Sequence, residues 1–272
     1  MAGARRAPGA RPGPHRVAPA GTVPLARALS KRGLASRAEA IALILAGRVR
    51  LEGRVVRDPG IAVVPERMVV DIDGAATTAP AWRAIALHKP RGVVTTRRDP
   101  DGRPTVHDLI APLGGGLAPA GRLDLASTGL IVCTNDTRLA SWLTSPASDL
   151  DKEYVVTVRG TLDAATLEGL AGGVEDRGEW LRPTSLRLLK ASTRESHVAV
   201  VLTEGKNREI RRLFAAAGHD VTRLLRVRIG GLELGSLAPG DWRDIRQEKL
   251  AVYFPEYSGG RSRRPRRSDP AR

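Results

Sequence analysis

Residues 121–136 read GRLDLASTGLIVCTND, and this stretch decides how the rest of the chain is interpreted. A charged pair, Arg122 and Asp124, directly precedes an apolar run from Gly129 to Cys133 that is typical of a buried strand. In isolation, Asp124 would most simply cap a turn with Arg122 as its partner, because aspartate side chains often bond nearby backbone amides. The alternative is a carboxylate that has a chemical role next to a rigid strand.

The residues around this stretch predict a domain that mixes strands with short helices. Strand-like runs rich in β-branched residues occur at 84–88, 129–133, 154–158, 197–202 and 222–229. Helical spacing of apolar residues occurs near 136–144, 163–171 and 207–217. The three glycines at 114–116 lack the following Lys-Ser/Thr of a phosphate-binding loop. We therefore predict an α+β domain over residues 84–257, with a mixed, mainly antiparallel sheet and short flanking helices and without a nucleotide-binding motif.

A second, smaller domain is predicted at residues 23–76, followed by a linker at 77–83. Apolar residues repeat at helical spacing from Leu25, and Ser36 with Glu39 forms a capping box that begins a second helix. Two short β-branched runs meet at Glu52 and Gly53, which predicts a hairpin, and one further strand ends near Asp71. The small domain thus reads helix, helix, hairpin, strand.

The formal net charge is +15, and more than half of it lies in the two tails, residues 1–22 and 258–272. Both tails lack large apolar side chains and are predicted to be disordered. The rest of the chain stays basic, which favours a polyanionic partner. Within 23–57, only Glu39 and Glu52 oppose a set of basic residues: Arg27, Lys31, Arg32, Arg37, Arg48, Arg50, Arg54 and Arg57. This asymmetry predicts a nucleic-acid-binding face, although solvated arginines are the simpler alternative.

Several classes of protein are disfavoured by composition. The single cysteine, Cys133, allows no intramolecular disulfide and no multi-cysteine zinc site, and the five histidines lack metal-ligand spacing. No apolar run reaches the ~18 residues that a membrane span requires, and no apolar signal segment follows the basic N-terminus. We expect a soluble, cytoplasmic protein without a metal ion.

Two further stretches carry candidate functional residues. Residues 151–158 read DKEYVVTV, and strand alternation places Lys152 and Tyr154 on one face with two valines. An ordinary core tyrosine is the simpler interpretation of Tyr154. Residues 203–214 read TEGKNREIRRLF and open a helix that we expect Asn207 to cap and Gly218 to end.

The basic residues of this helix are Arg208, Arg211 and Arg212, which share one face because they stand three and four positions apart. A solvated helix face would explain them equally well. For residues 121–136, 151–158 and 203–214, the wider sequence context decides between the structural and the functional interpretation.

Taken together, residues 121–136, 151–158 and 203–214 resemble pseudouridine synthases of the RsuA and RluB type, and so does the LHKPRGVV stretch at 87–94. Residues 23–76 resemble an S-four-type RNA-binding domain. The resemblance spans residues 23–245. The departures are minor: Leu213 stands where the family often has methionine, and His88 where asparagine is commoner.

The resemblance implies roles for individual residues. Asp124 would be the catalytic residue, Tyr154 would stack on the target uracil, and Arg211 would approach Asp124 and favour its ionised form. The remaining basic residues of these motifs would contact RNA: Arg122, Lys152, Lys206, Arg208 and Arg212. Asp124 could either attack ribose C1′ or remove a ribose proton, and the sequence leaves both pathways open. The reaction is an isomerisation, so no cofactor is expected.

The expected substrate is a uridine in ribosomal RNA, free or within a pre-ribosomal particle, flipped out of its helix into the site. The pair Asn207 and Arg208 resembles the large-subunit enzymes more than the small-subunit branch. A monomer is expected. Two alternatives remain at this point: a non-catalytic ribosome-assembly factor that keeps the fold, and the same chemistry on transfer RNA.

Overall fold

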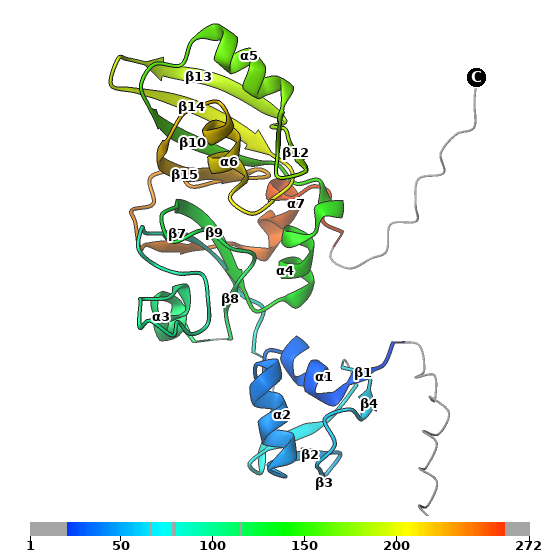
Figure 1. Ribbon diagram of the computed structural model, residues 1–272. Helices are drawn as coiled ribbons and strands as arrows, with labels where there is room; N and C mark the ends of the chain where they lie inside the picture. The colour runs from blue at the N-terminus through cyan, green and yellow to red at the C-terminus, as the bar shows by residue number, and fades with distance from the viewer. Residues whose placement is uncertain (1–20, 66, 78–79, 115, 259–272) are drawn as a thin grey trace, which may run out of the picture. The chain divides into compact units, whose positions relative to one another are not determined.

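The computed structural model describes residues 21–65, 67–77, 80–114 and 116–258 (Figure 1). The predicted basic tails, residues 1–22 and 258–272, lie almost wholly outside these residues. Contacts within the chain divide it into two compact units, residues 1–78 and 79–272. Among the described residues, no helix is long and apolar enough to cross a membrane.

The small unit consists of two helices and short strands. Its elements are β1 (Val23–Pro24), α1 (Leu25–Lys31), α2 (Arg37–Leu45), β2 (Val49–Leu51), β3 (Arg54–Val56), β4 (Ala62–Val63), β5 (Val70–Ile72) and β6 (Ala75–Ala76). Four strands form an antiparallel sheet in the order β3-β2-β5-β6. The predicted capping box is present, since Ser36 Oγ accepts from Glu39 N and the Glu39 carboxylate accepts from Ser36 N. Leu25, Leu29 and Ile44 are fully buried where α1 packs on α2.

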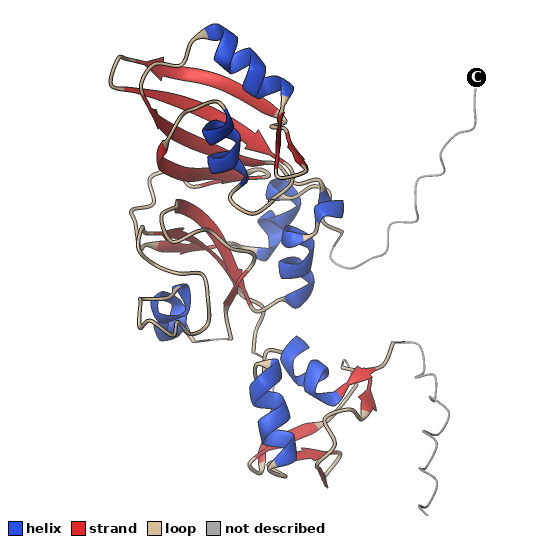
Figure 2. Cartoon of the chain, in the orientation of Figure 1, coloured by secondary structure: helices blue, strands red, loops and turns tan. Residues whose placement is uncertain are grey.

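The large unit is built on one long sheet (Figure 2). Its strands are β7 (Ala84–Lys89), β8 (Ala118–Pro119), β9 (Thr128–Thr134), β10 (Lys152–Arg159), β11 (Val174–Asp176), β12 (Glu179–Leu181), β13 (Ser185–Ala191), β14 (Glu195–Leu202), β15 (Val221–Ile229), β16 (Leu232–Glu233) and β17 (Trp242–Asp244). Its α-helices are α3 (Val106–Ile110), α4 (Thr137–Thr144), α5 (Ala164–Gly172), α6 (Glu209–Ala216) and α7 (Leu250–Tyr253). The predicted α+β fold with a mainly antiparallel sheet is confirmed.

The main path of the sheet runs β13-β14-β10-β15-β9-β7-β17, and β8 and β16 join it at the side. In this sheet, the described strand pairs are antiparallel except β9 with β15. A separate antiparallel hairpin, β11–β12, lies between α5 and β13 in the sequence.

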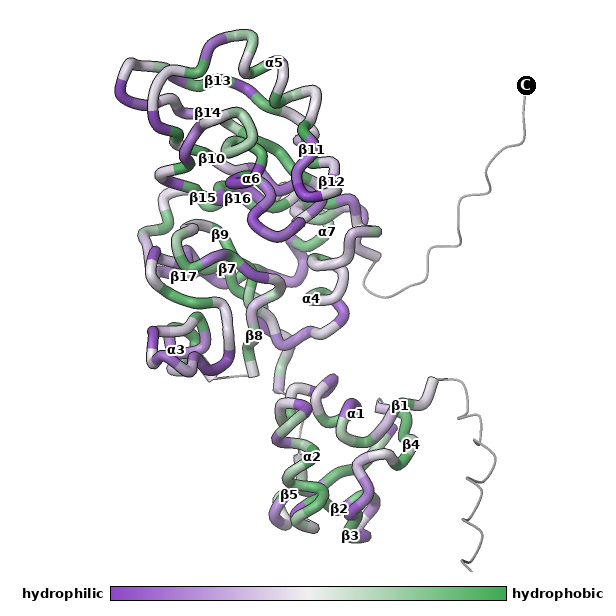
Figure 3. The backbone as a smooth tube through the Cα atoms, viewed as in Figure 1, coloured by the Kyte–Doolittle hydropathy of each residue, from purple (hydrophilic) through white to green (hydrophobic). Residues whose placement is uncertain are grey.

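Alternation along the strands explains how the helices cover this sheet. In β9, Leu130 and Val132 pack with residues of α4 and α7, whereas Ile131 and Cys133 pack with residues of α3. Both faces of β9 are therefore buried, and its residues form one hydrophobic segment in Figure 3. In the other half of the sheet, β10, β14 and β15 share a core with α5 and α6.

The two halves of the sheet meet where β9 lies beside β15. Only two registered residue pairs connect these strands, Thr128 with Leu225 and Gly129 with Arg226. Gly129 has a φ of 110°, and a Cβ atom at this position would lie 2.3 Å from the Arg226 carbonyl oxygen. Glycine is therefore required for this close approach of the two backbones. The junction brings the GRLD stretch next to β10 and β15.

Candidate active site

A cavity of about 750 Å³ opens at the junction of the two sheet halves. Its lining includes residues from all three stretches that the sequence singled out, among them Asp124, Tyr154 and Arg208. The fold therefore brings together segments that lie about 30 and 80 positions apart in the chain. Asp124 is exposed within this opening, whereas Tyr154 is buried at 8% exposure.

The loop that carries Asp124 is fixed from one side by residues 89–95. Thr95 Oγ1 donates to Leu123 O at 2.8 Å and accepts from Leu123 N at 3.2 Å. Gly92 N donates to Leu125 O at 2.9 Å. Because both neighbours of Asp124 are bound in this way, the backbone that carries its carboxylate is held in place before any substrate enters.

Lys89 also holds the loop that carries Asp124, through a hydrogen bond to Ser127 O. Its side chain is fully buried, and its ammonium donates to Pro90 O at 3.0 Å and Ser127 O at 2.9 Å. Burial lowers the pKa of Lys89 from 10.5 to about 8, while the charge of Asp124 acts in the opposite direction. Sequence reasoning did not single out Lys89 as a site residue. The only signal was its position in the Lys-Pro-Arg-Gly stretch.

Lys152 and Tyr154 lie on β10 and both line the cavity, which agrees with the prediction that they share one face of a strand. The Lys152 ammonium donates to Leu150 O at 2.9 Å and Thr203 O at 2.8 Å, and burial is the main cause that lowers its pKa. Lys152 therefore joins the start of β10 to the end of β14, and this bonding does not support the predicted RNA contact. Tyr154 packs in the core shared with α6 and also faces the cavity.

Arg211 is only partly placed as the resemblance implies. Its Nη1 donates to Val221 O at 2.8 Å, whereas Nε and Nη2 are buried without a hydrogen-bond partner among the described residues. Burial is the main cause that lowers its pKa, Arg208 and Arg91 add to this, and Asp124 opposes it. Asp124 and Arg211 thus interact electrostatically, but among the described residues no ion pair within 4.0 Å joins them.

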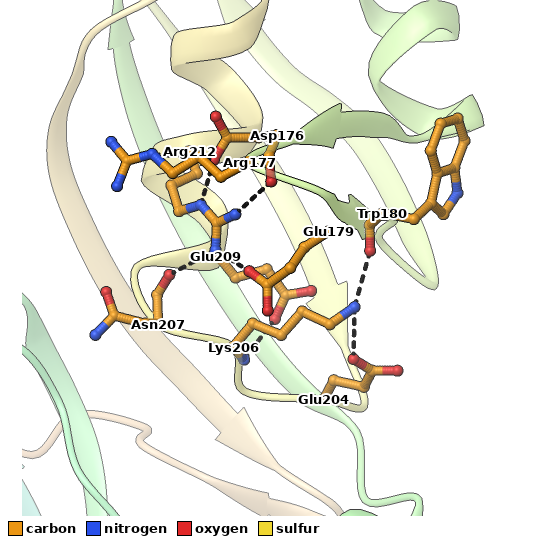
Figure 4. A network of polar contacts seen from close by, with 9 residues as sticks. All are labelled: Asp176, Arg177, Glu179, Trp180, Glu204, Lys206, Asn207, Glu209 and Arg212. Atoms are coloured by element: carbon orange, nitrogen blue, oxygen red, sulfur yellow. Dashed lines mark hydrogen bonds and ion pairs between the residues drawn. The ribbon is translucent and has the colours of Figure 1, made fainter.

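A polar network joins the β11–β12 hairpin to α6 and to the loop before it (Figure 4). The Arg212 guanidinium, whose side chain is 13% exposed, pairs with the carboxylates of Asp176 and Glu179 and donates to Asp176 O at 2.7 Å. Lys206 Nζ donates to Trp180 O at 2.8 Å and pairs with Glu204 at 2.9 Å. Carboxylates and backbone carbonyls of the chain itself accept from both groups, which does not support phosphate contacts at Arg212 or Lys206.

The prediction that Asn207 caps α6 is wrong. Arg208 occupies the N-cap position with a φ of 48° and makes no side-chain capping bond. The Glu209 carboxylate instead accepts from Lys206 N at 3.0 Å, which closes the loop on itself. Arg208 and Arg122 remain exposed and line the cavity, so both are available for a phosphate.

The predicted RNA-binding residues of the small unit are mostly exposed. This holds for Arg27, Lys31, Arg37 and Arg50. Two others have partners within the unit. Arg32 donates to Met68 O at 2.8 Å, and Arg48 forms a two-pronged ion pair with Asp73. The exposed residues keep a basic surface on the small unit.

Comparisons with known proteins identify the family. Residues 83–216 match RNA pseudouridylate synthase, and residues 23–69 match the S4 domain. The chain belongs to the RNA pseudouridylate synthase family and is a pseudouridine synthase with an N-terminal S4 domain, as the resemblance predicted.

Individual relatives support this assignment. An RNA pseudouridine synthase of Aquifex aeolicus is 38% identical over 83% of this chain and 91% of its own length. Ribosomal large subunit pseudouridine synthase B of Escherichia coli K12 is 37% identical over 81% of this chain and 78% of its own length. A crystal structure of a pseudouridylate synthase superposes with a TM-score of 0.60 at 28% identity, over 84% of this chain and 98% of that one.

Proposed function

We propose that this protein isomerises a specific uridine of ribosomal RNA to pseudouridine, and that the RNA belongs to the large subunit. The proposal for the substrate rests on the similarity to ribosomal large subunit pseudouridine synthase B at 37% identity. The exposed arginines of the S4 domain supply a surface that attracts RNA phosphates. The substrate is ribosomal RNA or an assembling ribosomal particle, and the enzyme acts as a monomer.

The observation that carries the catalytic proposal is the Asp124 carboxylate, exposed in the cavity on a loop bound at Leu123, Leu125 and Ser127. An ionised carboxylate suits either attack on C1′ or removal of a ribose proton. Tyr154 forms one wall, where an aromatic ring stacks on a flipped uracil. Arg211 moves toward Asp124 when the substrate fills the cavity, which satisfies its two unpartnered nitrogens.

The chemistry needs no external group. The bond between C1′ and uracil N1 breaks, the base turns, and C5 joins C1′, so the product is an isomer of the substrate. The chain's own residues bind the RNA, exclude water and orient the carboxylate, and no cofactor enters any step.

The test maps pseudouridine in ribosomal RNA from cells that lack this protein, by chemical labelling and reverse-transcription stops. The deletion strain is complemented with wild type, with Asp124→Asn, or with Glu168→Gln, an exposed carboxylate on α5 that serves as the matched control. We expect one large-subunit stop to vanish on deletion and to return with wild type and Glu168→Gln only.

Other outcomes assign the protein elsewhere. If pseudouridine is lost from a site in small-subunit or transfer RNA instead, the proposed reaction stands and that RNA is the substrate. If no site changes in any of these RNAs, the proposed activity is refuted and a non-catalytic assembly role takes its place.

A further inference from the structure

The cavity contains a buried arginine that neither the motifs nor the family assignment gives a role. Arg226 lies in β15, is 6% exposed and lines the cavity. In the sheet it stands opposite Tyr154 of β10 on one side and Gly129 of β9 on the other. Residues that are directly opposite in an antiparallel pair share a face, so the side chains of Arg226 and Tyr154 point the same way. The Arg226 guanidinium carbon lies 6.0 Å from the centre of the Tyr154 ring.

Arg226 differs from the two lysines near it, Lys89 and Lys152, in how many hydrogen bonds its side chain makes. Lys89 and Lys152 each donate to two backbone carbonyls, which accounts for their positions. Arg226 Nε donates to Leu130 O at 2.7 Å, and this is the one hydrogen bond of its guanidinium among the described residues. Its terminal nitrogens are not among the buried atoms without partners, unlike Nε and Nη2 of Arg211. They are therefore reached from the cavity and are available to a ligand.

The charge around Arg226 indicates what kind of ligand fits. Lys89 and Lys152 lie close enough for the Arg226 charge to lower both of their pKa values, in each case as a smaller effect than burial. Three carboxylate residues, Asp124, Glu204 and Glu209, line the same cavity, and among the described residues none of them forms an ion pair with Arg226. A buried cation without an anionic partner is costly, and a negatively charged or strongly polar ligand removes that cost.

The part of an RNA substrate that reaches this depth is the flipped base, because the phosphates stay with the backbone at the surface. Uracil presents two carbonyl oxygens, O2 and O4, to a donor such as a guanidinium. A planar pair of N–H donors matches a carbonyl that gains negative charge.

We propose that Arg226 is a catalytic residue that binds the carbonyl oxygens of the target uracil and stabilises the negative charge of the base while it is detached from the ribose. This inference rests on the proposed function. When the bond between C1′ and N1 breaks, N1 keeps the electron pair, and the charge spreads onto O2 and O4. Asp124 meanwhile either bonds to C1′ or takes the C2′ proton.

The remaining steps balance without any other group. The base turns, C5 uses the electron pair to bond to C1′, Asp124 is released or returns its proton, and the C5 proton is lost while N1 gains one. Arg226 stays protonated throughout and acts as a fixed countercharge. Its low exposure strengthens the interaction, because water does not screen it.

The test uses the full-length protein and an RNA fragment that contains the target uridine, in single-turnover reactions with enzyme in excess. The variants are Arg226→Met and Arg226→Lys. Arg228→Met is the matched control, because Arg228 lies on the same strand and pairs with Glu153. RNA affinity and thermal unfolding are measured for every variant.

We expect Arg226→Met to lower the single-turnover rate by about 100-fold or more, as the loss of one donor to a developing anion does in other enzymes, while RNA affinity is retained. Arg226→Lys keeps the charge with different geometry and loses less. Arg228→Met keeps the wild-type rate. A folded Arg226→Met or Arg226→Lys that turns over uridine at the rate of wild type overturns the inference.

A second readout separates charge stabilisation from a structural role. The substrate is RNA that carries 5-fluorouridine at the target, because the fluorine makes the base a better leaving group. Bond cleavage is measured as the loss of the 5-fluorouridine peak in nucleoside digests. The defect of both Arg226 variants shrinks with this substrate if Arg226 stabilises the departing base. If a variant loses the same factor in rate with uridine and with 5-fluorouridine, Arg226 does not stabilise the departing base. This comparison can be made with Arg226→Lys alone if Arg226→Met does not fold. If wild type itself converts no uridine, the proposed function fails instead.

Discussion

The burial of Lys89 leads to a testable dependence of stability on pH. In the folded protein its pKa is about 8, below the ordinary value of 10.5 that the unfolded chain has. Between these values the unfolded chain holds a proton that the folded protein has released, so the free energy of unfolding rises with pH. From pH 7 to 9.5, this one group contributes a rise of about 2 kcal/mol.

The perturbation is Lys89→Met, which removes the titrating group and keeps the volume of the side chain. The variant leaves Pro90 O and Ser127 O without their donor, so its absolute stability changes for a second reason. Comparing the pH dependence of the two proteins cancels that effect, and we expect wild type to gain about 2 kcal/mol more than Lys89→Met between pH 7 and 9.5.

The assay is urea unfolding followed by tryptophan fluorescence. All four tryptophans lie in residues 79–272, so the signal reports the catalytic unit alone. Lys190→Met, at an exposed lysine on β13, is the control and should behave as wild type. Parallel pH dependences of wild type and Lys89→Met would show that the Lys89 ammonium is not buried as described.

Three further predictions concern the site and the S4 domain. Arg212→Met removes the guanidinium that pairs with Asp176 and Glu179 and should lower the free energy of unfolding, measured by urea unfolding; exposed Arg223→Met is the control, and equal stability of the two variants would show that the network does not stabilise the fold. Arg211→Ala should cripple single-turnover conversion and retain RNA binding in a filter assay, whereas near-normal turnover argues against a role beside Asp124. Deleting residues 1–76 should weaken binding of ribosomal RNA and flatten its salt dependence, and unchanged affinity removes the assigned role of the S4 domain.

Local sequence patterns predicted much of the fold because they reflect local physics. The alternation in β9 and β10 and the capping box at Ser36 and Glu39 depend on residues only a few positions apart. The α3 helix and the β11–β12 hairpin were not predicted. Val106–Ile110 is only five residues long, and Val174–Asp176 contains one apolar residue followed by two acidic ones. Neither segment therefore gives a strong periodic signal.

The part of the site that sequence reasoning missed depends on contacts between distant residues. Lys89 donates to Ser127 O, 38 positions away, and Arg212 meets Asp176, 36 positions away. An arginine on a helix face looks the same in a sequence whether RNA or a distant carboxylate binds it. Arg226 was missed for the same reason, because β15 as a sequence gives no sign that this residue faces a cavity.

The measurement that tests the central claim most directly is proton release from C5. Large-subunit ribosomal RNA transcribed with uridine tritiated at C5 is incubated with the purified protein, and tritium in the water is counted. Wild type and Glu168→Gln should release tritium equivalent to one uridine per RNA, and Asp124→Asn should release none. Release by Asp124→Asn at the wild-type rate would contradict the assignment of Asp124 as the catalytic carboxylate.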